Sequence, residues 1–212
     1  MTIDDIMRRA PVIPVLVIEE GIDPVALAEA LVEGGLPVIE VTLRTPNALA
    51  AMNAMARVDG AIVGAGTVLD EAMLGIAIDA GARFVVSPGL TDPLARAAIA
   101  SGIPFLPGVA TAGDIMRGLD HGLKRFKFFP AEAAGGLPAL KALAGPFGDI
   151  RFCPTGGITS DSAAQWLAHP SVLCVGGSWI LPSGERDMAA VAARARDAAS
   201  RGIVSAARGR DL

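Results

Sequence analysis

Eight short runs rich in apolar and β-branched residues recur about every 20 residues along the chain. Between them lie longer stretches rich in alanine and leucine, with the spacing of amphipathic helices. Near-continuous apolar strands that alternate with helices predict a parallel sheet covered on both faces. The eight runs are residues 12–18, 37–43, 61–68, 83–89, 104–110, 125–131, 150–157 and 172–179.

The number of these units predicts an α/β fold, a (β/α)8 TIM barrel with a short N-terminal helix from Thr2 to about Arg9. A doubly wound open sheet is the alternative. No linker interrupts the pattern, so we expect one domain over residues 1–212. The sequence after Pro182 is expected to form the last helix and a frayed tail.

Helix boundaries are marked by proline and glycine. A proline after a capping residue predicts a helix start, and a glycine after a helical stretch predicts a stop. The expected starts are Asp23-Pro24, Thr45-Pro46 and Asp92-Pro93, and the expected stops are Gly34 and Gly102.

Composition narrows the functional classes. The formal net charge of -4 gives no electrostatic reason to expect nucleic acid or an anionic membrane as a partner. Cys153 and Cys174 stand alone in apolar runs, which predicts buried reduced thiols and neither a disulfide nor a zinc site. The chain has no membrane-length apolar stretch and no N-terminal signal pattern, so we expect a cytoplasmic protein.

Lys127 is a lysine in the middle of a predicted strand, within the sequence FKFFPAE. Alternation places Lys127 and Phe129 on one face and Phe126 and Phe128 on the other. If the latter two pack under the helices, Lys127 points into the barrel. Burial disfavours the charged form of an amine, and the neutral amine is the nucleophile that forms a Schiff base with a carbonyl. The alternative is a structural lysine paired with a carboxylate.

Glu40 is the expected partner of Lys127, because it is the carboxylate that lies deep within a predicted strand. Facing a Schiff-base lysine, it can move protons as a general acid and base, or serve only as the counter-ion. Arg44 shares its face nearer the strand end and could bind a substrate carboxylate, or could simply cap the strand in solvent. Thr67 and Thr155 place hydroxyls at strand ends near the lysine, although ordinary β-branched packing explains them equally well.

Two glycine pairs follow the seventh and eighth runs. Backbone N–H groups next to glycine can approach an anion closely, and these loops often bind phosphate in (β/α)8 barrels. Tight turns also favour glycine, so each pair alone is weak evidence. The predicted phosphate site consists of Gly156, Gly157, Gly176, Gly177 and Ser178.

Other motifs are set aside. The sequence GAGT at residues 64–67 lacks the third glycine of a dinucleotide-binding motif. His121 and His169 lie toward helix ends, which argues against a histidine mechanism or a metal centre. Ser87 has no neighbouring base to activate it, so we expect it to serve a loop turn.

From about Pro11 to Ile180 the chain resembles the KDPG/KHG aldolase family, whose substrates are 2-keto-3-deoxy-6-phosphogluconate (KDPG) and 2-keto-4-hydroxyglutarate (KHG). The resemblance rests on the sequences VIEVTLRTP, GAGTV, FKFFPAE, FCPTGGI and VLCVGGSW. It implies a class I aldolase that cleaves KDPG to pyruvate and glyceraldehyde 3-phosphate. It also implies homotrimers and no metal or organic cofactor.

By the same resemblance, Lys127 corresponds to the Schiff-base lysine and Glu40 to the acid and base. Arg44, Thr67 and Thr155 correspond to contacts with the pyruvate end, and Phe129 to an aromatic ring packed on the site. The two glycine pairs with Ser178 correspond to the phosphate site.

Alternatives stay open within the family and beyond it. Within it, KHG or 2-keto-3-deoxy-6-phosphogalactonate is the other substrate, although the glycine pairs favour a phosphorylated one. Beyond it, the barrel could be a sugar-phosphate isomerase or epimerase, or a phosphate-binding protein without activity. Epimerases of this kind typically use histidine or aspartate at strand ends, and the sequence has none there.

Overall fold

The computed structural model of the chain describes residues 1–208, with side chains described through Arg201. The strands are β1 (Val12–Leu16), β2 (Val38–Thr42), β3 (Ile62–Gly66), β4 (Val85–Val86), β5 (Phe105–Leu106), β6 (Gly108–Val109), β7 (Arg125–Phe128), β8 (Arg151–Pro154) and β9 (Val175–Gly177). The helices are α1 (Ile3–Met7), α2 (Pro24–Glu33), α3 (Ala48–Met55), α4 (Glu71–Asp79), α5 (Asp92–Ser101), α6 (Ala112–Asp120), α7 (Gly136–Ala144), α8 (Ser160–Leu167) and α9 (Met188–Arg208).

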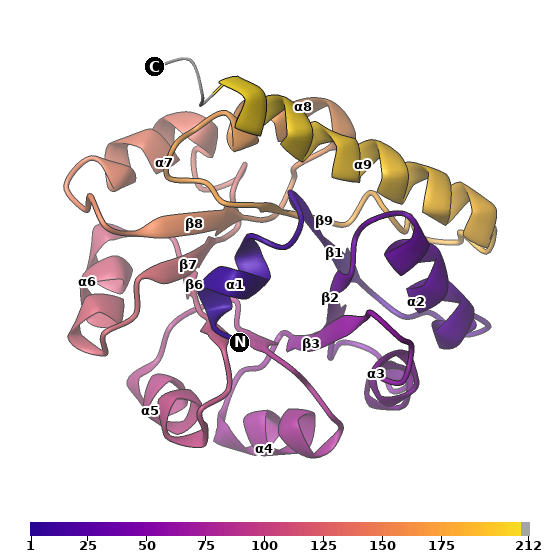
Figure 1. Cartoon of the computed structure of the whole chain (residues 1–212). Helices are drawn as coiled ribbons and strands as arrows, with labels where there is room; N and C mark the ends of the chain where they lie inside the picture. The colour runs from indigo at the N-terminus through magenta and orange to yellow at the C-terminus, as the bar shows by residue number, and fades with distance from the viewer. Residues whose placement is uncertain (209–212) are drawn as a thin grey trace.

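The strands form a closed barrel surrounded by helices, so the predicted (β/α)8 fold is confirmed (Figure 1). One parallel sheet runs β5-β4-β3-β2-β1-β9, and the other runs β6-β7-β8. The two sheets meet at Pro107, where the chain passes from β5 to β6. They meet again where bridges join Phe152 to Val172 and Thr155 to Gly176.

Every predicted run contains a strand, but the fifth contains two. Pro107 separates Phe105–Leu106 from Gly108–Val109. Proline has no N–H to donate to a strand ladder, so it interrupts the pairing at this point. Its carbonyl still accepts a hydrogen bond from the Lys127 N–H at 2.8 Å, which keeps β7 beside this segment.

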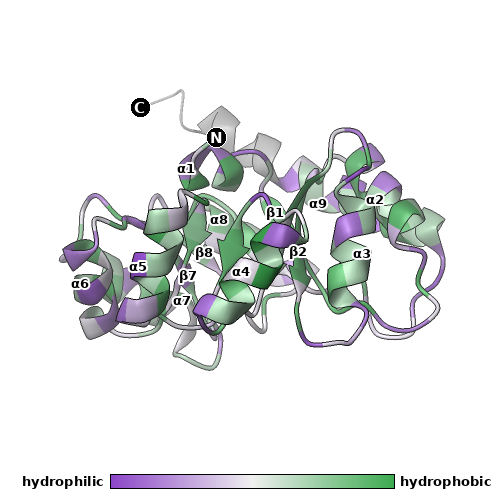
Figure 2. Ribbon diagram, turned by 90° about the horizontal axis from the view of Figure 1, so that it is seen from below, coloured by the Kyte–Doolittle hydropathy of each residue, from purple (hydrophilic) through white to green (hydrophobic). Residues whose placement is uncertain are grey.

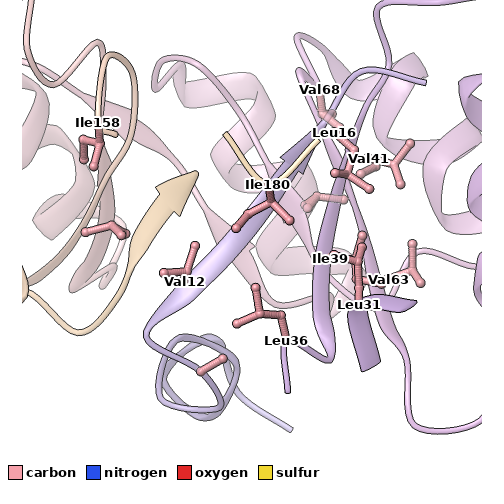
Figure 3. Close-up of a cluster of buried hydrophobic side chains, with 14 of the residues drawn as sticks. Val12, Leu16, Leu31, Leu36, Ile39, Val41, Val63, Val68, Ile158 and Ile180 are labelled. Atoms are coloured by element: carbon pink, nitrogen blue, oxygen red, sulfur yellow. The ribbon is translucent and has the colours of Figure 1, made fainter. Parts of the chain in front are cut away.

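Two layers of apolar side chains lie on opposite faces of the strands. The larger cluster fills the space between strands and helices and includes Val12, Leu16, Ile39 and Val41 (Figure 3). Green hydrophobic strands run between the surrounding helices, which carry purple hydrophilic residues (Figure 2). This separation is what a sheet buried on both faces requires.

The second cluster fills the base of the barrel. Ile6 and Met7 of α1 are fully buried there with Ile13 of β1 and with Phe84, which directly precedes β4. The helix lies across the centre of the ring in Figure 1, at the end where the strands begin. The helix expected near residues 2–9 therefore closes the barrel from below.

Both cysteines belong to this interior cluster and are free, as predicted. Burial, together with the hydrogen bond and charge of Cys153, raises the pKa of the Cys174 thiol. Cys174 is therefore an uncharged thiol at neutral pH, consistent with its apolar surroundings.

The predicted helix boundaries are partly confirmed. The Asp23 side chain accepts hydrogen bonds from two backbone N–H groups of α2, and Gly34 and Gly102 follow α2 and α5. The start predicted at Thr45 is wrong, because α3 begins at Ala48. The Ala48 N–H bonds to the Thr45 carbonyl in a turn that precedes the helix.

The predicted last helix is present as α9. The frayed tail expected beyond it, and the last residues of the single domain predicted over 1–212, lie outside the described residues. Among the helices of residues 1–208, none combines the length and apolar character that a membrane span requires.

Candidate active site

Lys127 and Glu40 form a buried ion pair inside the barrel. The Lys127 Nζ lies 3.0 Å from Glu40 Oε1, and the two residues are 5% and 3% exposed. Phe126 and Phe128 belong to the helix-facing cluster, so the alternation of β7 turns Lys127 inward as the sequence predicts. Strands β2 and β7 are not neighbours, and the two side chains meet in the barrel interior.

Small neighbours make room for the Glu40 carboxylate. Gly66 of β3 lies beside it, and a Cβ atom at this position would collide with Glu40 Oε1. Thr42, two residues further along β2, is fully buried and donates a hydrogen bond from its hydroxyl to the Leu16 carbonyl at 2.8 Å. Gly66 of β3 therefore leaves room for the Glu40 carboxylate. The hydrogen bond of Thr42 holds β2 against β1 two residues further along the strand.

The ion pair has the geometry for proton transfer. Two buried charges remain stable only when they are paired, because each alone has lost its hydration. If the proton passes from Nζ to Oε1, the result is a neutral amine and a neutral acid at the same distance. The amine can then attack a carbonyl carbon, and the acid can donate the proton that the reaction needs next.

Phe129 covers one side of the lysine. The Lys127 Nζ lies 5.4 Å from the centre of the Phe129 ring, within the range of a cation–π contact. The ring is half-buried and follows directly after β7. It therefore limits the approach of water to the amine from this side.

Arg44 and Thr67 meet at the mouth of the barrel, beyond the ends of β2 and β3. The Arg44 Nε donates to Thr67 Oγ1 at 3.4 Å, and the Arg44 side chain is exposed. Thr67 has a φ of +62°, a left-handed conformation that is unusual for a β-branched residue. Strained backbone of this kind is often found at functional sites.

The glycine pairs have two structural causes. Gly156 and Gly157 have φ values of +104° and +82°, which other residues adopt with difficulty. Gly176 packs against Thr155, and a Cβ atom on Gly176 would collide with Thr155 Oγ1. Turn geometry and close packing therefore account for glycine here, and phosphate binding by these residues stays a prediction.

Two cavities open at the mouth. One of about 520 Å³ is lined by residues that include Val15, Glu19, Ser178 and Trp179. Val15 is the register partner of Glu40, so this cavity lies next to the strand position of the acid. The other, of about 350 Å³, is lined by Phe129, by β6 and by segments that follow β3, β4 and β6, with Thr91 and Asp114 among its polar residues. Neither lining includes Lys127 or Glu40, which lie deeper.

The residues set aside from the sequence lie elsewhere. His121 follows α6 and pairs with Asp92 at 3.1 Å, and His169 lies beyond the end of α8. The Ser87 hydroxyl donates to the Gly89 carbonyl at 2.6 Å, which fits the loop turn expected for it. Within residues 1–208, no cluster of three or more metal-ligating side chains is found.

Two charged groups, one at the base of the barrel and one at its mouth, were not predicted. Asp4 of α1 pairs with Arg125, which precedes Lys127 on the same face of β7. Glu19, in the loop after β1, binds the loop after β9 that carries Ser178. Its position directly after a strand was the one available signal, because polar residues at such ends line the mouth of the barrel.

Comparisons with known proteins identify the family of the chain. A family model described as KDPG and KHG aldolase matches residues 3–194. The 2-dehydro-3-deoxy-phosphogluconate aldolase of Zymomonas mobilis is 59% identical over 198 residues, covering 93% of this chain and 95% of that protein. The KHG/KDPG aldolase of Escherichia coli is 52% identical over 181 residues, covering 85% of each.

A solved structure adds a chemical detail. The KDPG aldolase of Legionella pneumophila was captured with pyruvate at low pH as a covalent carbinolamine intermediate. It superposes with a TM-score of 0.90 at 44% identity, covering 94% of this chain and 98% of that one. The chain belongs to the KDPG and KHG aldolase family.

Proposed function

We propose that this protein is a class I aldolase that cleaves KDPG to pyruvate and glyceraldehyde 3-phosphate through a Schiff base on Lys127. The observation that carries the proposal is the buried amine held 3.0 Å from the Glu40 carboxylate. The Zymomonas mobilis relative carries the name of this activity at 59% identity.

The reaction begins at the ketone. Proton transfer to Glu40 leaves the Lys127 amine neutral, and the amine attacks C2 to form a carbinolamine. Glu40 returns a proton to the departing hydroxyl, and water leaves as the iminium forms. A carbinolamine with pyruvate is the state named for the Legionella pneumophila enzyme.

Cleavage uses the iminium as the electron sink. Glu40 accepts the proton of the C4 hydroxyl, the C3–C4 bond breaks, and its electrons move toward the nitrogen to form an enamine. Glyceraldehyde 3-phosphate leaves. Protonation of the enamine at C3 and hydrolysis of the resulting iminium then release pyruvate and restore the lysine.

The substrate would lie across the mouth. Arg44, with Thr67, would bind the carboxylate, since a guanidinium can hold two carboxylate oxygens. Thr155 would contact the keto group, and Phe129 would pack against the pyruvate end. The phosphate would be held by Gly156, Gly157, Gly176, Gly177 and Ser178. The cavity of about 520 Å³ would receive the part of the substrate between the phosphate and the pyruvate end.

A second substrate, KHG, has specific support. The Escherichia coli relative is named for both substrates. KHG has no phosphate, so it would use the same lysine without the contacts of Ser178. Comparing kcat/KM for KDPG, for its galactonate epimer and for KHG measures the preference, and we expect KDPG to be highest.

Borohydride reduction with pyruvate, followed by mass mapping, tests the mechanism. We expect pyruvate to become attached to Lys127 and cleavage of KDPG to be lost in parallel. An unmodified lysine in a protein that cleaves KDPG would contradict the Schiff base. An unmodified lysine with isomerase activity, or with no activity, would instead favour the isomerase or the inactive barrel.

The wider expectations stay predictions. The family resemblance implies a homotrimer without metal or organic cofactor. Sedimentation analysis of the purified protein tests the trimer. Activity that persists after treatment with a chelator would support cleavage without a metal.

A further inference from the structure

The carboxylate of Glu19 joins two loops at the mouth of the barrel. Glu19 lies in the loop between β1 and α2, and its partners lie in the loop between β9 and α9, here called the 178–187 loop. The Ser183 hydroxyl donates to Oε1 at 2.6 Å. The Gly184 N–H and Arg186 Nη2 donate to Oε2 at 3.1 and 3.2 Å.

The geometry of these contacts is specific. Gly184 has a φ of +80°, a conformation suited to glycine. In this conformation its N–H points toward Glu19. Arg186 also donates to the backbone carbonyl of Glu20 at 3.1 Å. Three side chains and two backbone groups therefore hold the two loops together, more than a single surface ion pair would provide.

A separate set of contacts holds the other side of the 178–187 loop. Arg194 of α9 donates from Nε to the Ile180 carbonyl at 3.0 Å, and from Nη2 to Glu185 at 2.8 Å. These contacts tie the loop to its own following helix. Glu19, together with the contact of Arg186 to the Glu20 carbonyl, ties it to the loop that follows the neighbouring strand β1, beside a cavity that both Glu19 and Ser178 line.

We propose that Glu19 is a positioning residue for the phosphate end of the substrate, because it fixes the 178–187 loop and thereby Ser178. The proposal rests on the proposed function, since it requires Ser178 to contact a phosphate. The loss of these contacts would let the loop move away from the cavity. Binding of a phosphorylated substrate would weaken, whereas chemistry at Lys127 would not change.

A carboxylate beside a phosphate site needs a compensating charge, and Arg186 supplies it. Hydrogen bonds from Ser183, Gly184 and Arg186 lower the pKa of Glu19, so it is ionised at neutral pH. Its oxygens are directed to these three donors. The phosphate therefore meets an ion pair rather than an isolated negative charge.

The test compares two neighbouring glutamates. Glu19→Ala removes the contacts, whereas Glu20→Ala removes the same charge from an exposed side chain and leaves the Glu20 carbonyl available to Arg186. We expect Glu19→Ala to raise KM for KDPG at least about fivefold and Glu20→Ala to change it less than about twofold. Both should react with pyruvate and borohydride at the wild-type rate, because pyruvate has no phosphate. Equal KM values in the two variants would overturn the proposal.

Two further variants serve as controls for this test. Glu19→Gln keeps an acceptor oxygen for Ser183 or Gly184 and should give an intermediate KM. If Glu19→Ala does not fold, Arg186→Met replaces it, and a wild-type KM would then count against the proposal. If pyruvate does not label Lys127 in the wild-type protein, the proposed function itself is contradicted. If Lys127 is labelled but the Glu19 variants have a wild-type KM, only the role of Glu19 is contradicted.

Discussion

Arg125 and Lys127 are two cations on the same face of β7, and their surroundings differ. Arg125 lies at the base of the barrel, where it pairs with Asp4 and donates to the carbonyls of Lys124 and Asp149 at 3.0 and 3.3 Å. For Lys127, the hydrogen-bond partner recorded among the described residues is Glu40. The guanidinium of Arg125 donates to groups of the folded chain and so stabilises the fold. The Lys127 amine retains N–H groups that can interact with a substrate.

The two ends of the barrel repeat this contrast. At the base, α1 covers the interior with fully buried Ile6 and Met7. At the mouth, Arg44 and Ser178 are exposed, and cavities lie between the loops. Substitutions at the mouth and in the middle should therefore affect activity, whereas those at the base should affect stability.

Lys127→Met should have the largest effect. Without the amine, no Schiff base forms, and kcat for KDPG should fall by at least about 10⁴-fold. Steady-state kinetics and borohydride labelling measure this loss. The matched control is Arg125→Met, which should still be labelled at Lys127. Full activity in Lys127→Met would mean that Lys127, like Arg125, is not needed for catalysis.

Glu40→Gln should have the next largest effect. The amide cannot accept the proton of the amine or of the C4 hydroxyl, so kcat should fall by about 10²–10⁴-fold. Labelling of Lys127 by pyruvate should continue at a reduced rate, as rapid-quench mass spectrometry would show. Glu29→Gln, an exposed change on α2, should leave kcat unaltered. A normal kcat in Glu40→Gln would mean that Glu40 serves only as the counter-ion of Lys127.

Ser178→Asp sharpens the contrast at the mouth. A new negative charge beside the phosphate costs about 1–2 kcal/mol at the exposed surface, which corresponds to about a tenfold rise in KM for KDPG. Unphosphorylated 2-keto-3-deoxygluconate should be cleaved with the wild-type KM. An equal rise for both substrates would mean that the substitution disturbs the loop and not the phosphate.

Asp4→Asn should have the smallest effect, and only on stability. Burial raises the pKa of Asp4, but hydrogen bonds and charges from Arg8 and Arg125 outweigh it, and the pKa falls below its usual value of 3.8. The ionised carboxylate therefore stabilises the fold above pH 3.8, and this contribution is lost as the pH falls through the folded pKa. Because the pair is partly exposed, we expect a loss of up to about 1 kcal/mol at neutral pH.

Urea unfolding at several pH values measures this contribution. The difference between the wild type and Asp4→Asn should narrow as the pH falls below 3.8, while kcat at neutral pH stays the same. A difference that is constant with pH would mean that the charge of Asp4 is not what stabilises the base.

The sequence was most informative where one strand determines its own geometry. The period of two along β2 and β7 is enough to predict that Glu40 and Lys127 face inward, because successive side chains must alternate. The eight strand positions followed from a different local signal, the near-continuous apolar runs of strands buried on both faces. Pro107 shows the limit within a strand: its missing N–H divides β5 from β6, although the run reads as continuous.

The features that were missed depend on residues far apart in the chain. Asp4 and Arg125 are separated by 121 residues, and Glu19 and Arg186 by 167. Local periodicity cannot predict which charged side chains meet across a closed sheet, because that depends on the register and on the loops. The start predicted at Thr45 failed because Asn47, and not Thr45, is the residue before the first helical turn of α3.

The bridge between Thr155 and Gly176 completes the barrel between β8 and β9. The residues that follow it on each side are those assigned to the phosphate. The junction that is joined by isolated bridges is thus also the place where the ligand would be held, and a bound phosphate would connect the loops on its two sides. Local opening at this junction would abolish binding while most of the barrel stayed intact, and product or substrate in solution should protect the enzyme against that loss.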